Sequence, residues 1–548
     1  MTEQGQGPLE RGLTVLRALA DSPEPRLRRS DLTKITGIPR SPVDRVLETL
    51  IQLGYVREEG RDALIAPGAM APGNAYLASS PLRAALTGHV AQLANQLDES
   101  VSLAVPDRTA ARLIDQAVRR RTMYLAFHIG GLLPAERTAA GVVLASDWSG
   151  EDFSTWRKQR AMDPLDASFN AVPTRAGPPD EDELERDFTT WIRQARADGW
   201  ALDDEWVEPG LLALGAPVHA PDGTVAGAIS VLTHTSRHTP ESFISEVVPP
   251  LRAATTEMTA ALTASPPTPG HPRVHPAQAS ELRLRKQDLG MGFLEGLARG
   301  LAVIEAFQGT LGGLTITAAA EATGLSRATA RRNLLTLTAL GYARLVGDTF
   351  QLQPAVMDLG FERLSPLTLA DLATPHLREL AHASGQSASL AVLDGDDIRS
   401  IAKAAAPRVL RIDVNPGTRL PAPPTALGRV LLAGLPPSER AERLSRFTPQ
   451  PYTSATLTSQ GAIAEAVDTV SRDGYALVDQ EFHEGIRSLA VPIHDSAGRT
   501  LAALNLTLHS GSSSADAERD ELLPVLRMAA RRIEADVALA FACAEPVL

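Results

Sequence analysis

The chain has 548 residues, which corresponds to about three to five domains of ordinary size. Apolar residues make up 44% and aromatic residues only 4%, a composition that argues against a disordered or collagen-like chain. The formal net charge of -12 excludes a chain-wide basic surface, so any DNA binding must depend on a local one.

Motifs for export, membrane insertion and catalysis are missing from the sequence. No stretch reaches 18 uncharged apolar residues, and the first residues, MTEQGQGPLERGL, lack the basic end and apolar core of a signal peptide. We therefore expect a cytoplasmic protein with no membrane partner. The single cysteine, Cys543, excludes an internal disulfide framework. No nucleophile elbow, phosphate-binding loop or convincing metal-ligand spacing is present, so we expect no enzyme activity, no metal and no cofactor.

The chain is a tandem repeat. Leu53-Gly54-Tyr55 recurs as Leu340-Gly341-Tyr342 at a spacing of 287 residues. The spacing drops to 275 between Asp198-Gly199-Trp200 and Asp473-Gly474-Tyr475, so the first copy carries 12 extra residues between about 145 and 195. A proline-rich stretch, SPPTPGHPRVHPAQAS, lies between the copies and is typical of a semi-extended linker.

The first 75 residues of each copy predict a winged helix-turn-helix. In the second copy Thr315 can cap a short helix, Gly324 suits the tight turn after it, and Gly341 ends the next helix. The predicted elements are, in chain order, a helix at 300–307, a Gly-rich turn at 309–313, a helix at 318–322, a second helix from Ser326 to about Leu340, and a hairpin of 342–346 and 349–352.

The second of these helices carries the candidate DNA contacts. A helix in the major groove presents its N-terminal residues to base edges and phosphates, and arginine and hydroxyl side chains suit that position. Leu334 and Leu337 face inward, while the start of the helix is polar. The predicted DNA-binding residues of the second copy are Ser326, Arg327, Thr329, Arg331 and Arg332.

The first copy has the same frame but different charges. Asp44 stands where the second copy has Arg331, and a carboxylate there would repel phosphate. The predicted DNA-binding residues of this copy are Arg40, Ser41 and Arg45. Three roles stay open for it: weak DNA binding, recognition of a different half-site, or a structural partnership with the second copy.

The remainder of each copy predicts a mixed α/β domain with an antiparallel sheet. Such a sheet, covered by helices and loops, can enclose a small-molecule pocket. In the second copy the β-rich runs are 389–393, 409–413, 489–493 and 501–508, and the helices lie near 368–384, 425–434, 459–474 and 518–541.

Each copy resembles the IclR family of bacterial transcription regulators. The matching stretches include LTITAAAEATGLSRATARRNLLTLTALGYARL and DGYALVDQEFHEGIRSLAVPIHDSAGRTLAALNLTLH in the second copy, and TGIPRSPVDRVLETLIQLGYV and DGWALDDEWVEPGLLALGAPVHAPDGTVAGAISVL in the first. The second copy is also similar to the subgroup that controls aromatic-acid catabolism. The resemblance implies an α+β protein, a tandem duplication of a winged helix-turn-helix joined to a GAF-like effector-binding domain. The implied segments are a winged helix-turn-helix at 1–75, a GAF-like domain at 76–264, the linker at 265–290, a winged helix-turn-helix at 291–362 and a GAF-like domain at 363–548.

The resemblance also implies an effector pocket in each GAF-like domain. The helix starting at Thr425 or Thr138 could direct backbone N–H groups at a ligand carboxylate, whereas a helix cap or a loop polar group is the alternative for every candidate. In the second copy the candidates are Ser389, Thr425, Ala426, Gly428, Asp479, Glu481 and Asn505. In the first copy they are Ser102, Thr138, Ala139, Gly141, Asp204, Trp206 and Ser230. Arg487 fits the family pattern, but the first copy has Leu212 there, so the two pockets are expected to take different ligands, or only one is expected to bind.

We therefore expect a transcription regulator whose affinity for a double-stranded DNA operator is changed by a small organic effector, acidic or aromatic in character. Two unlike recognition helices in one chain would form a covalent pseudo-dimer for an asymmetric operator. Whether two chains pair further as a homodimer, and whether the protein represses or activates, stay open. The alternative is a ligand-sensing or scaffold protein whose winged helices mediate assembly. For a third possibility, an enzyme built on the effector domain, the sequence offers no nucleophile.

Overall fold

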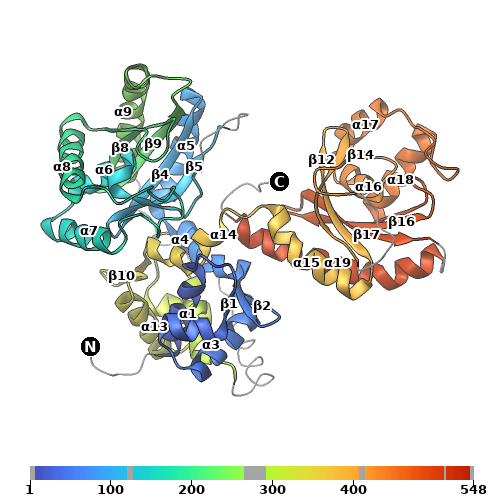
Figure 1. Ribbon diagram of the computed structural model, residues 1–548, viewed down its shortest axis with the longest axis horizontal. Coiled ribbons are helices and arrows are strands. Elements are labelled where there is room, and N and C mark those ends of the chain that lie inside the picture. Colours follow the sequence, from blue (N-terminus) through green and yellow to red (C-terminus); the bar gives the residue numbers. More distant parts are fainter. Residues whose placement is uncertain (1–6, 120–126, 265–291, 407–413, 511–513, 543–548) are drawn as a thin grey trace. The chain divides into compact units, whose positions relative to one another are not determined.

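The computed structural model describes residues 7–119, 127–264, 292–406, 414–510 and 514–542. The chain divides into two compact units, Met1–Pro366 and Leu367–Leu548. The first unit contains both winged helix-turn-helix domains and the first effector domain, and the second unit is the second effector domain (Figure 1). The predicted linker at 265–290 lies outside the described residues.

Both winged helix-turn-helix domains are present as predicted. Gly37 and Gly324 end the first helix of each motif with φ values of 68° and 66°, a left-handed conformation that turns the chain sharply toward the next helix. The first domain consists of α1 (Pro8–Ala20), β1 (Leu27–Arg28), α2 (Arg29–Thr36), α3 (Arg40–Gln52), β2 (Val56–Glu59) and β3 (Asp62–Ile65). The second consists of α11 (Glu295–Glu305), α12 (Ile316–Thr323), α13 (Arg327–Ala339), β10 (Ala343–Val346) and β11 (Thr349–Leu352).

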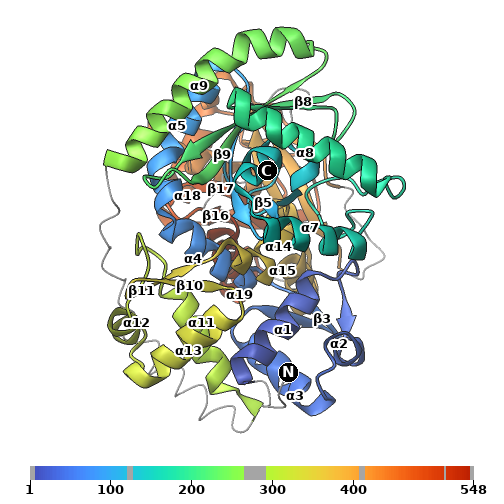
Figure 2. The same cartoon turned by 90° about the vertical axis from the view of Figure 1, so that its left-hand side faces the viewer.

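The two winged helix-turn-helix domains pack against each other through α1 and α11, with α3 and α13 on opposite sides of this helix pair (Figure 2). Gly12 lies against the side chain of Leu297, and Gly300 lies against the side chain of Leu9. These contacts exchange equivalent positions of the two copies, which is the property of a two-fold interface. Neither glycine has a Cβ, and an added Cβ would overlap the leucine opposite it. The glycines therefore set the close approach of the two helices.

Polar contacts across the same interface fix the pairing. The Tyr55 hydroxyl donates a hydrogen bond to Glu305 Oε1 at 2.6 Å. The backbone N–H of Leu294 donates to Thr49 Oγ1 at 2.8 Å. The two winged helix-turn-helix domains of the chain are thus in contact within one compact unit.

A connector leads from each winged helix-turn-helix domain into its effector domain. The first connector consists of η1 (Pro67–Met70), α4 (Ala71–Ser79) and α5 (Pro81–Leu97), and the second of η5 (Pro354–Leu359), α14 (Phe361–Leu364) and α15 (Leu369–Ser384). Gly73 of α4 lies against Phe361 of α14. The contact between α4 and α14 extends the pairing of the two copies beyond the DNA-binding domains.

Each effector domain is built on a six-stranded antiparallel sheet, and the two sheets have the same strand order. The first sheet has the order β6-β5-β4-β9-β8-β7, with β4 (Ser100–Asp107), β5 (Ala110–Ala117), β6 (Leu132–Pro134), β7 (Ala201–Asp204), β8 (Leu211–His219) and β9 (Val225–His234). The second has the order β14-β13-β12-β17-β16-β15, with β12 (Ser387–Asp394), β13 (Asp397–Ala404), β14 (Arg419–Pro421), β15 (Ala476–Asp479), β16 (Ile486–His494) and β17 (Thr500–His509). The duplication predicted from the sequence is confirmed.

Helices cover both faces of each sheet, and a buried apolar core lies on either side. In the second unit α15 and α19 share one core with the sheet, and α16 and α18 share the other (Figure 1). The remaining helices of the second domain are α16 (Ala426–Ala433), α17 (Pro437–Arg446), α18 (Gln460–Asp473) and α19 (Ala515–Ala540). Those of the first domain are η2 (Ala135–Arg137), α6 (Ala139–Leu144), η3 (Ala145–Asp147), α7 (Gly150–Met162), α8 (Glu181–Asp198) and α9 (Pro240–Ala264).

The second effector sheet contains three strands that the sequence did not predict: β13 (Asp397–Ala404), β14 (Arg419–Pro421) and β15 (Ala476–Asp479). The predicted strand at 409–413 falls outside the described residues. The 12 extra residues of the first copy lengthen α7 and α8, which have 13 and 18 residues where α17 and α18 have 10 and 14. They also lengthen the connection between these helices. In the part of the chain that the structure describes, no helix is long and apolar enough to cross a membrane.

Candidate DNA-binding and effector-binding sites

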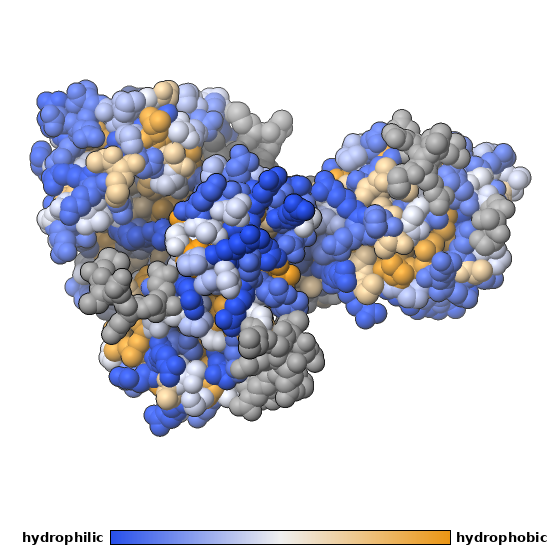
Figure 3. Space-filling model, turned by 60° about the horizontal axis from the view of Figure 1, so that its bottom comes forward, coloured by the Kyte–Doolittle hydropathy of each residue, from blue (hydrophilic) through white to orange (hydrophobic). Residues whose placement is uncertain are grey.

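The second recognition helix, α13, presents its predicted residues to solvent. Ser326 is the N-cap, and its Oγ accepts a hydrogen bond from the backbone N–H of Thr329 at 3.2 Å. Arg327, Arg331 and Arg332 are exposed, and no ion pair joins them to a carboxylate of the described residues. On the face of the molecule shown in Figure 3, hydrophilic side chains predominate. The start of α13 therefore offers three cations for phosphates and base edges.

In the first recognition helix, α3, the charged residues Arg40 and Asp44 form ion pairs. Arg40, Ser41 and Arg45 are exposed. Asp44, however, pairs with Arg29 at 3.2 Å and with Arg40 at 3.7 Å. Arg29 also reaches Glu58 of the wing at 2.9 Å, so Asp44 belongs to an ion cluster that joins α3, α2 and β2. The sequence did not reveal the ion pair of Asp44 with Arg29, because the two residues are 15 positions apart in the chain.

The second effector domain encloses a cavity of about 140 Å³ between its sheet and the start of α16. Four of the seven predicted effector residues line it: Ser389, Thr425, Ala426 and Asn505. Thr425 is the N-cap of α16, and its Oγ1 accepts a hydrogen bond from Gly428 N at 3.0 Å. Thr425 is thus a helix cap that also lines the cavity.

The lining of this cavity combines apolar surface with polar groups. Phe482 and Leu420 supply apolar surface, and Ser488 and Thr507 supply hydroxyl groups. Lys403 lines the cavity, and no carboxylate is among its described lining residues. The cavity is therefore mainly apolar, with one lysine and several hydroxyl groups in its lining.

The sequence prediction missed Lys403, although one signal was available. Lys403 is one of only four lysines in the chain and follows an alternating pattern, DIRSIAKA. In the structure it lies opposite Ser389 in the β12–β13 register. Recognition of β13 as a strand would have placed it beside Ser389.

Three predicted residues of the second domain lie outside the cavity lining. Gly428 is packed against the backbone of Ala422 at the start of α16. Glu481 forms a bidentate ion pair with the buried Arg429, and Asp479 pairs with Arg487 at 2.9 Å. Both acids are therefore engaged in ion pairs with buried arginines.

The predicted residues of the first effector domain are mostly buried. Thr138 caps α6 and accepts a hydrogen bond from Gly141 N at 3.0 Å, as Thr425 does in the second domain. Trp206 stacks on Trp191 with ring centroids 4.0 Å apart. Asp204 is exposed, and the remaining predicted residues are buried: Ser102, Ala139 and Ser230.

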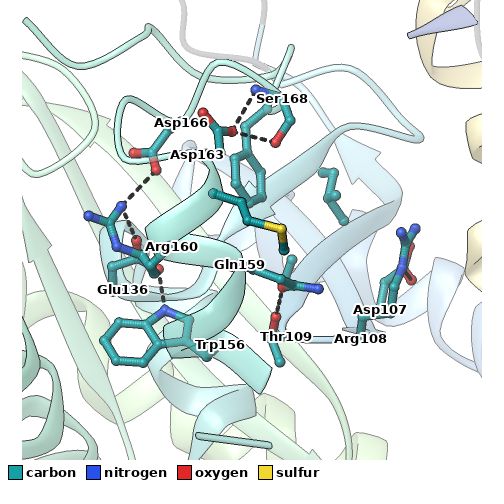
Figure 4. A pocket seen from close by; sticks show the side chains of 14 residues that line it. Asp107, Arg108, Thr109, Glu136, Trp156, Gln159, Arg160, Asp163, Asp166 and Ser168 are labelled. Atoms are coloured by element: carbon teal, nitrogen blue, oxygen red, sulfur yellow. Dashed lines mark hydrogen bonds and ion pairs between the residues drawn. The ribbon is translucent and has the colours of Figure 1, made fainter. Parts of the chain in front are cut away.

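The first domain has a different pocket, of about 240 Å³, beside α7 (Figure 4). Its polar side chains largely satisfy one another. Glu136 accepts a hydrogen bond from Trp156 Nε1 at 3.0 Å, and Arg160 pairs with Glu136 and Asp166 at 3.2 and 3.0 Å. Asp163 accepts from Ser168. Among the described residues of the chain no cluster of His, Cys, Asp and Glu could hold a metal ion.

An ion cluster joins the first effector domain to the connector of the second winged helix-turn-helix domain. Arg112 is fully buried and donates to Asp107, Asp358 and Glu362 at 2.8, 2.5 and 2.8 Å. Arg108 also pairs with Asp358 at 2.5 Å. Burial raises the pKa of Asp358, but Arg112 and Arg108 outweigh it and hold that pKa below its ordinary value. We call these five residues the Arg112 cluster.

The equivalent positions of the other copy cannot form such a cluster. Arg399 corresponds to Arg112, but it is partly exposed and pairs with Asp394 at 3.4 Å. In the first connector, Ala71 and Ala75 occupy the positions that correspond to Asp358 and Glu362 of the second connector. The copies therefore share their fold but differ at the residues of this cluster.

These features define a class of protein. Exposed arginines on a recognition helix serve DNA binding, and a joined α/β domain with a small cavity serves control by a small molecule. Profiles of known families identify it further: the IclR helix-turn-helix domain matches residues 8–60 and 296–347, and the bacterial transcriptional regulator IclR C-terminal domain matches residues 74–260 and 361–535. The chain belongs to the IclR family, as a tandem duplication of the family's unit, and is a DNA-binding transcriptional regulator.

Known relatives align with about half of the chain. The Pca regulon regulatory protein of Pseudomonas putida is 41% identical over 240 residues, which cover 44% of this chain and 82% of that protein. The p-hydroxybenzoate hydroxylase transcriptional activator of Acinetobacter baylyi is 32% identical over 264 residues, 47% of this chain and 95% of that protein. A solved transcriptional regulator structure from Rhodococcus sp. RHA1 is 41% identical, with a TM-score of 0.43, and the alignment covers 45% of this chain and all of that one.

Proposed function

We propose that one chain binds one asymmetric operator as a covalent pseudo-dimer. The observation that carries the proposal is the reciprocal packing of α1 and α11, which pairs two winged helix-turn-helix domains inside one polypeptide. Helix-turn-helix pairs recognise two half-sites, and a symmetric pair requires a palindrome. Here α13 carries Arg331 where α3 carries Asp44, so the two half-sites would differ in sequence.

In this proposal the second winged helix-turn-helix domain makes the stronger contact with DNA. Arg327, Arg331 and Arg332 are exposed at the start of α13 together with Ser326 and the half-buried Thr329. In α3, the ion pair with Asp44 reduces the charge that Arg40 offers to phosphate. Arg45 and Ser41 would supply the weaker contact of the first half-site.

A small organic acid bound in the second effector domain would control operator affinity. Support comes from the lining of its cavity, with Lys403, the hydroxyls of Ser488 and Thr507, and the ring of Phe482. A relative named for the transcription of p-hydroxybenzoate hydroxylase directs the choice of probe toward aromatic acids. The acid must bind the DNA-competent and incompetent arrangements unequally, because equal affinity shifts neither population.

A footprint on the DNA flanking the protein's own gene tests the proposal. The parent protein should protect an asymmetric site, and Arg331→Ala should weaken protection by the equivalent of about 1–3 kcal/mol if the side chain meets a base. Arg532→Ala, which removes an exposed arginine of the second effector domain, is the matched control and should leave protection unchanged.

The same titration separates regulation from the alternative function. Arginine contacts to phosphate predict an affinity that falls steeply as the salt concentration rises. Absence of protection at low salt would favour winged helices that mediate protein assembly. No catalytic activity is proposed, because the relatives that the chain resembles are regulators of transcription.

A further inference from the structure

The two effector domains differ at the positions that line the cavity of the second. Five lining residues of the second domain are partly exposed: Leu420, Phe482, Ile486, Ser488 and Thr507. Their equivalents in the first domain are buried and belong to one continuous apolar core: Leu133, Val207, Leu211, Ala213 and Leu232. The site that is open in the second domain is packed in the first.

A charged side chain is part of this packing. Arg137 stands where the second domain has Pro424, which lines the cavity. Arg137 is only 6% exposed and donates to Asp166 at 3.0 Å and to the backbone carbonyls of Pro173 and Val207 at 2.9 and 3.0 Å. Its guanidinium group is therefore fixed at a position that lines the cavity in the second domain.

The partner of Arg137 comes from the longer connection of the first domain. Asp166 lies between α7 and α8, in the region that holds the 12 extra residues. It also pairs with Arg160 at 3.0 Å and with Arg175 at 2.6 Å (Figure 4 shows Arg160 and Asp166). Arg137, Arg160 and Arg175 thus pair with the buried carboxylate of Asp166. This network holds the segment between α7 and α8 against the rest of the first effector domain.

The polar groups that would recognise an acid are also replaced. Ser488 becomes Ala213, Thr507 becomes Leu232, and Lys403 becomes Gln116. These changes remove two hydroxyl groups and the cation from the positions that line the cavity of the second domain.

We propose that the first effector domain is closed to the effector by its own Arg137–Asp166 ion pair, so that one chain binds one effector molecule, in its second domain. This inference rests on the proposed effector site of the second domain. The first domain then acts as a fixed partner, held to the connector of the second winged helix-turn-helix domain by the Arg112 cluster. The effector then acts on the chain through the second of its two homologous effector domains.

Two matched cysteine variants test the closure without knowledge of the effector. Ser389 and Ser102 occupy equivalent positions, opposite Asn505 and Ser230 in the sheet registers. Ser389→Cys and Ser102→Cys are made separately in a Cys543→Ser background, which removes the chain's single cysteine. The rate of reaction with methyl methanethiosulfonate is measured by mass spectrometry on the full-length protein.

The cysteine at position 389 should react roughly a hundredfold faster than that at position 102, because the latter becomes accessible only when the domain opens locally. Equally fast reaction at both positions would overturn the closure of the first domain and leave the proposed effector site intact. Slow reaction at both positions would instead overturn the open site of the second domain, and the proposed effector function with it. Equal reactivity of the two variants in urea serves as the control for the reagent.

The role of Arg137 itself is tested in the Ser102→Cys protein. Arg137→Ala should raise the rate of thiol modification at position 102 by at least about tenfold, because local opening then does not have to break the Arg137–Asp166 ion pair. Arg157→Ala removes an exposed ion pair with Glu185 in the same region and should have no effect. An unchanged rate in a folded Arg137→Ala protein would show that Arg137 does not close the site.

Discussion

Arg112 is completely buried, and its charge is stable there only because three carboxylates surround it. Removing one partner of a buried ion pair leaves the other charges uncompensated in a medium of low polarity. Arg399, the equivalent residue of the other copy, is partly exposed and pairs with Asp394. An exposed pair contributes little, because water screens both charges.

Arg112→Met should lower the free energy of unfolding of the first unit by about 3–5 kcal/mol. Arg399→Met, the matched control, should lower that of the second unit by about 1 kcal/mol or less. Urea unfolding followed by circular dichroism measures both. Similar losses in the two variants would contradict the difference that we infer between the copies.

Asp203 is a buried carboxyl group whose titration makes the stability of the protein depend on pH. Burial raises the pKa of Asp203 to about 7, against the opposing effect of Arg137 and with a further rise from Asp204. The folded protein therefore keeps a proton that the unfolded chain loses near pH 4. The free energy of unfolding should fall as pH rises from about 4 to about 7, and stay level above that.

Asp203→Asn removes this titration while keeping an oxygen that can accept from the backbone N–H of Trp206. The variant should match the parent at pH 4 and exceed its stability at pH 8 by up to a few kcal/mol, since one pKa unit corresponds to about 1.4 kcal/mol. Urea unfolding at pH 4.5, 6 and 8 checks this. A stability difference that is the same at all three pH values would refute it.

At the scale of elements, the helices and turns that local sequence patterns determine could be predicted from the sequence. The turn glycine Gly324 and the cap Ser326 sufficed to place α12 and α13. Strand β13 was missed, although its alternating burial fits a strand. The pairing of α1 with α11 and the Asp166 network were beyond prediction, because they join residues remote in sequence and depend on the packed structure.

The pairing of α1 and α11 can be tested at its glycines. Gly12→Val introduces side-chain atoms where Leu297 already lies and should cost about 1–3 kcal/mol of stability in the first unit. It should also weaken operator binding, because the spacing of the two recognition helices changes. Gly88→Ala is the control: this glycine lies in α5 facing open space, and alanine there should stabilise by about 0.5–1 kcal/mol.

Urea unfolding and fluorescence anisotropy with labelled operator DNA measure the two effects. If Gly12→Val loses stability but binds DNA as the parent does, the helix pair is a structural contact that does not set the spacing of the recognition helices.

At the scale of the whole molecule, fusion changes what an operator must look like. A homodimer presents two identical recognition helices, and its operator is a palindrome. In this chain the copies have diverged at Asp44 and Arg331, while the linkage keeps one copy at high effective concentration for the other. Divergence of the two recognition helices does not weaken the pairing of the winged helix-turn-helix domains, because both domains belong to one chain.

One 58.2 kDa chain should therefore bind one operator, with the stoichiometry measured by analytical ultracentrifugation of the protein–DNA complex. An operator with its natural half-sites should bind at least about tenfold more tightly than either palindrome built from one half-site, because each mismatched base pair costs about 1–3 kcal/mol. Anisotropy titrations at one fixed salt concentration compare the three DNAs. Two chains per operator with a preference for a palindrome would mean that equivalent α13 helices of two chains recognise the DNA, and the packing of α1 on α11 would then serve stability alone.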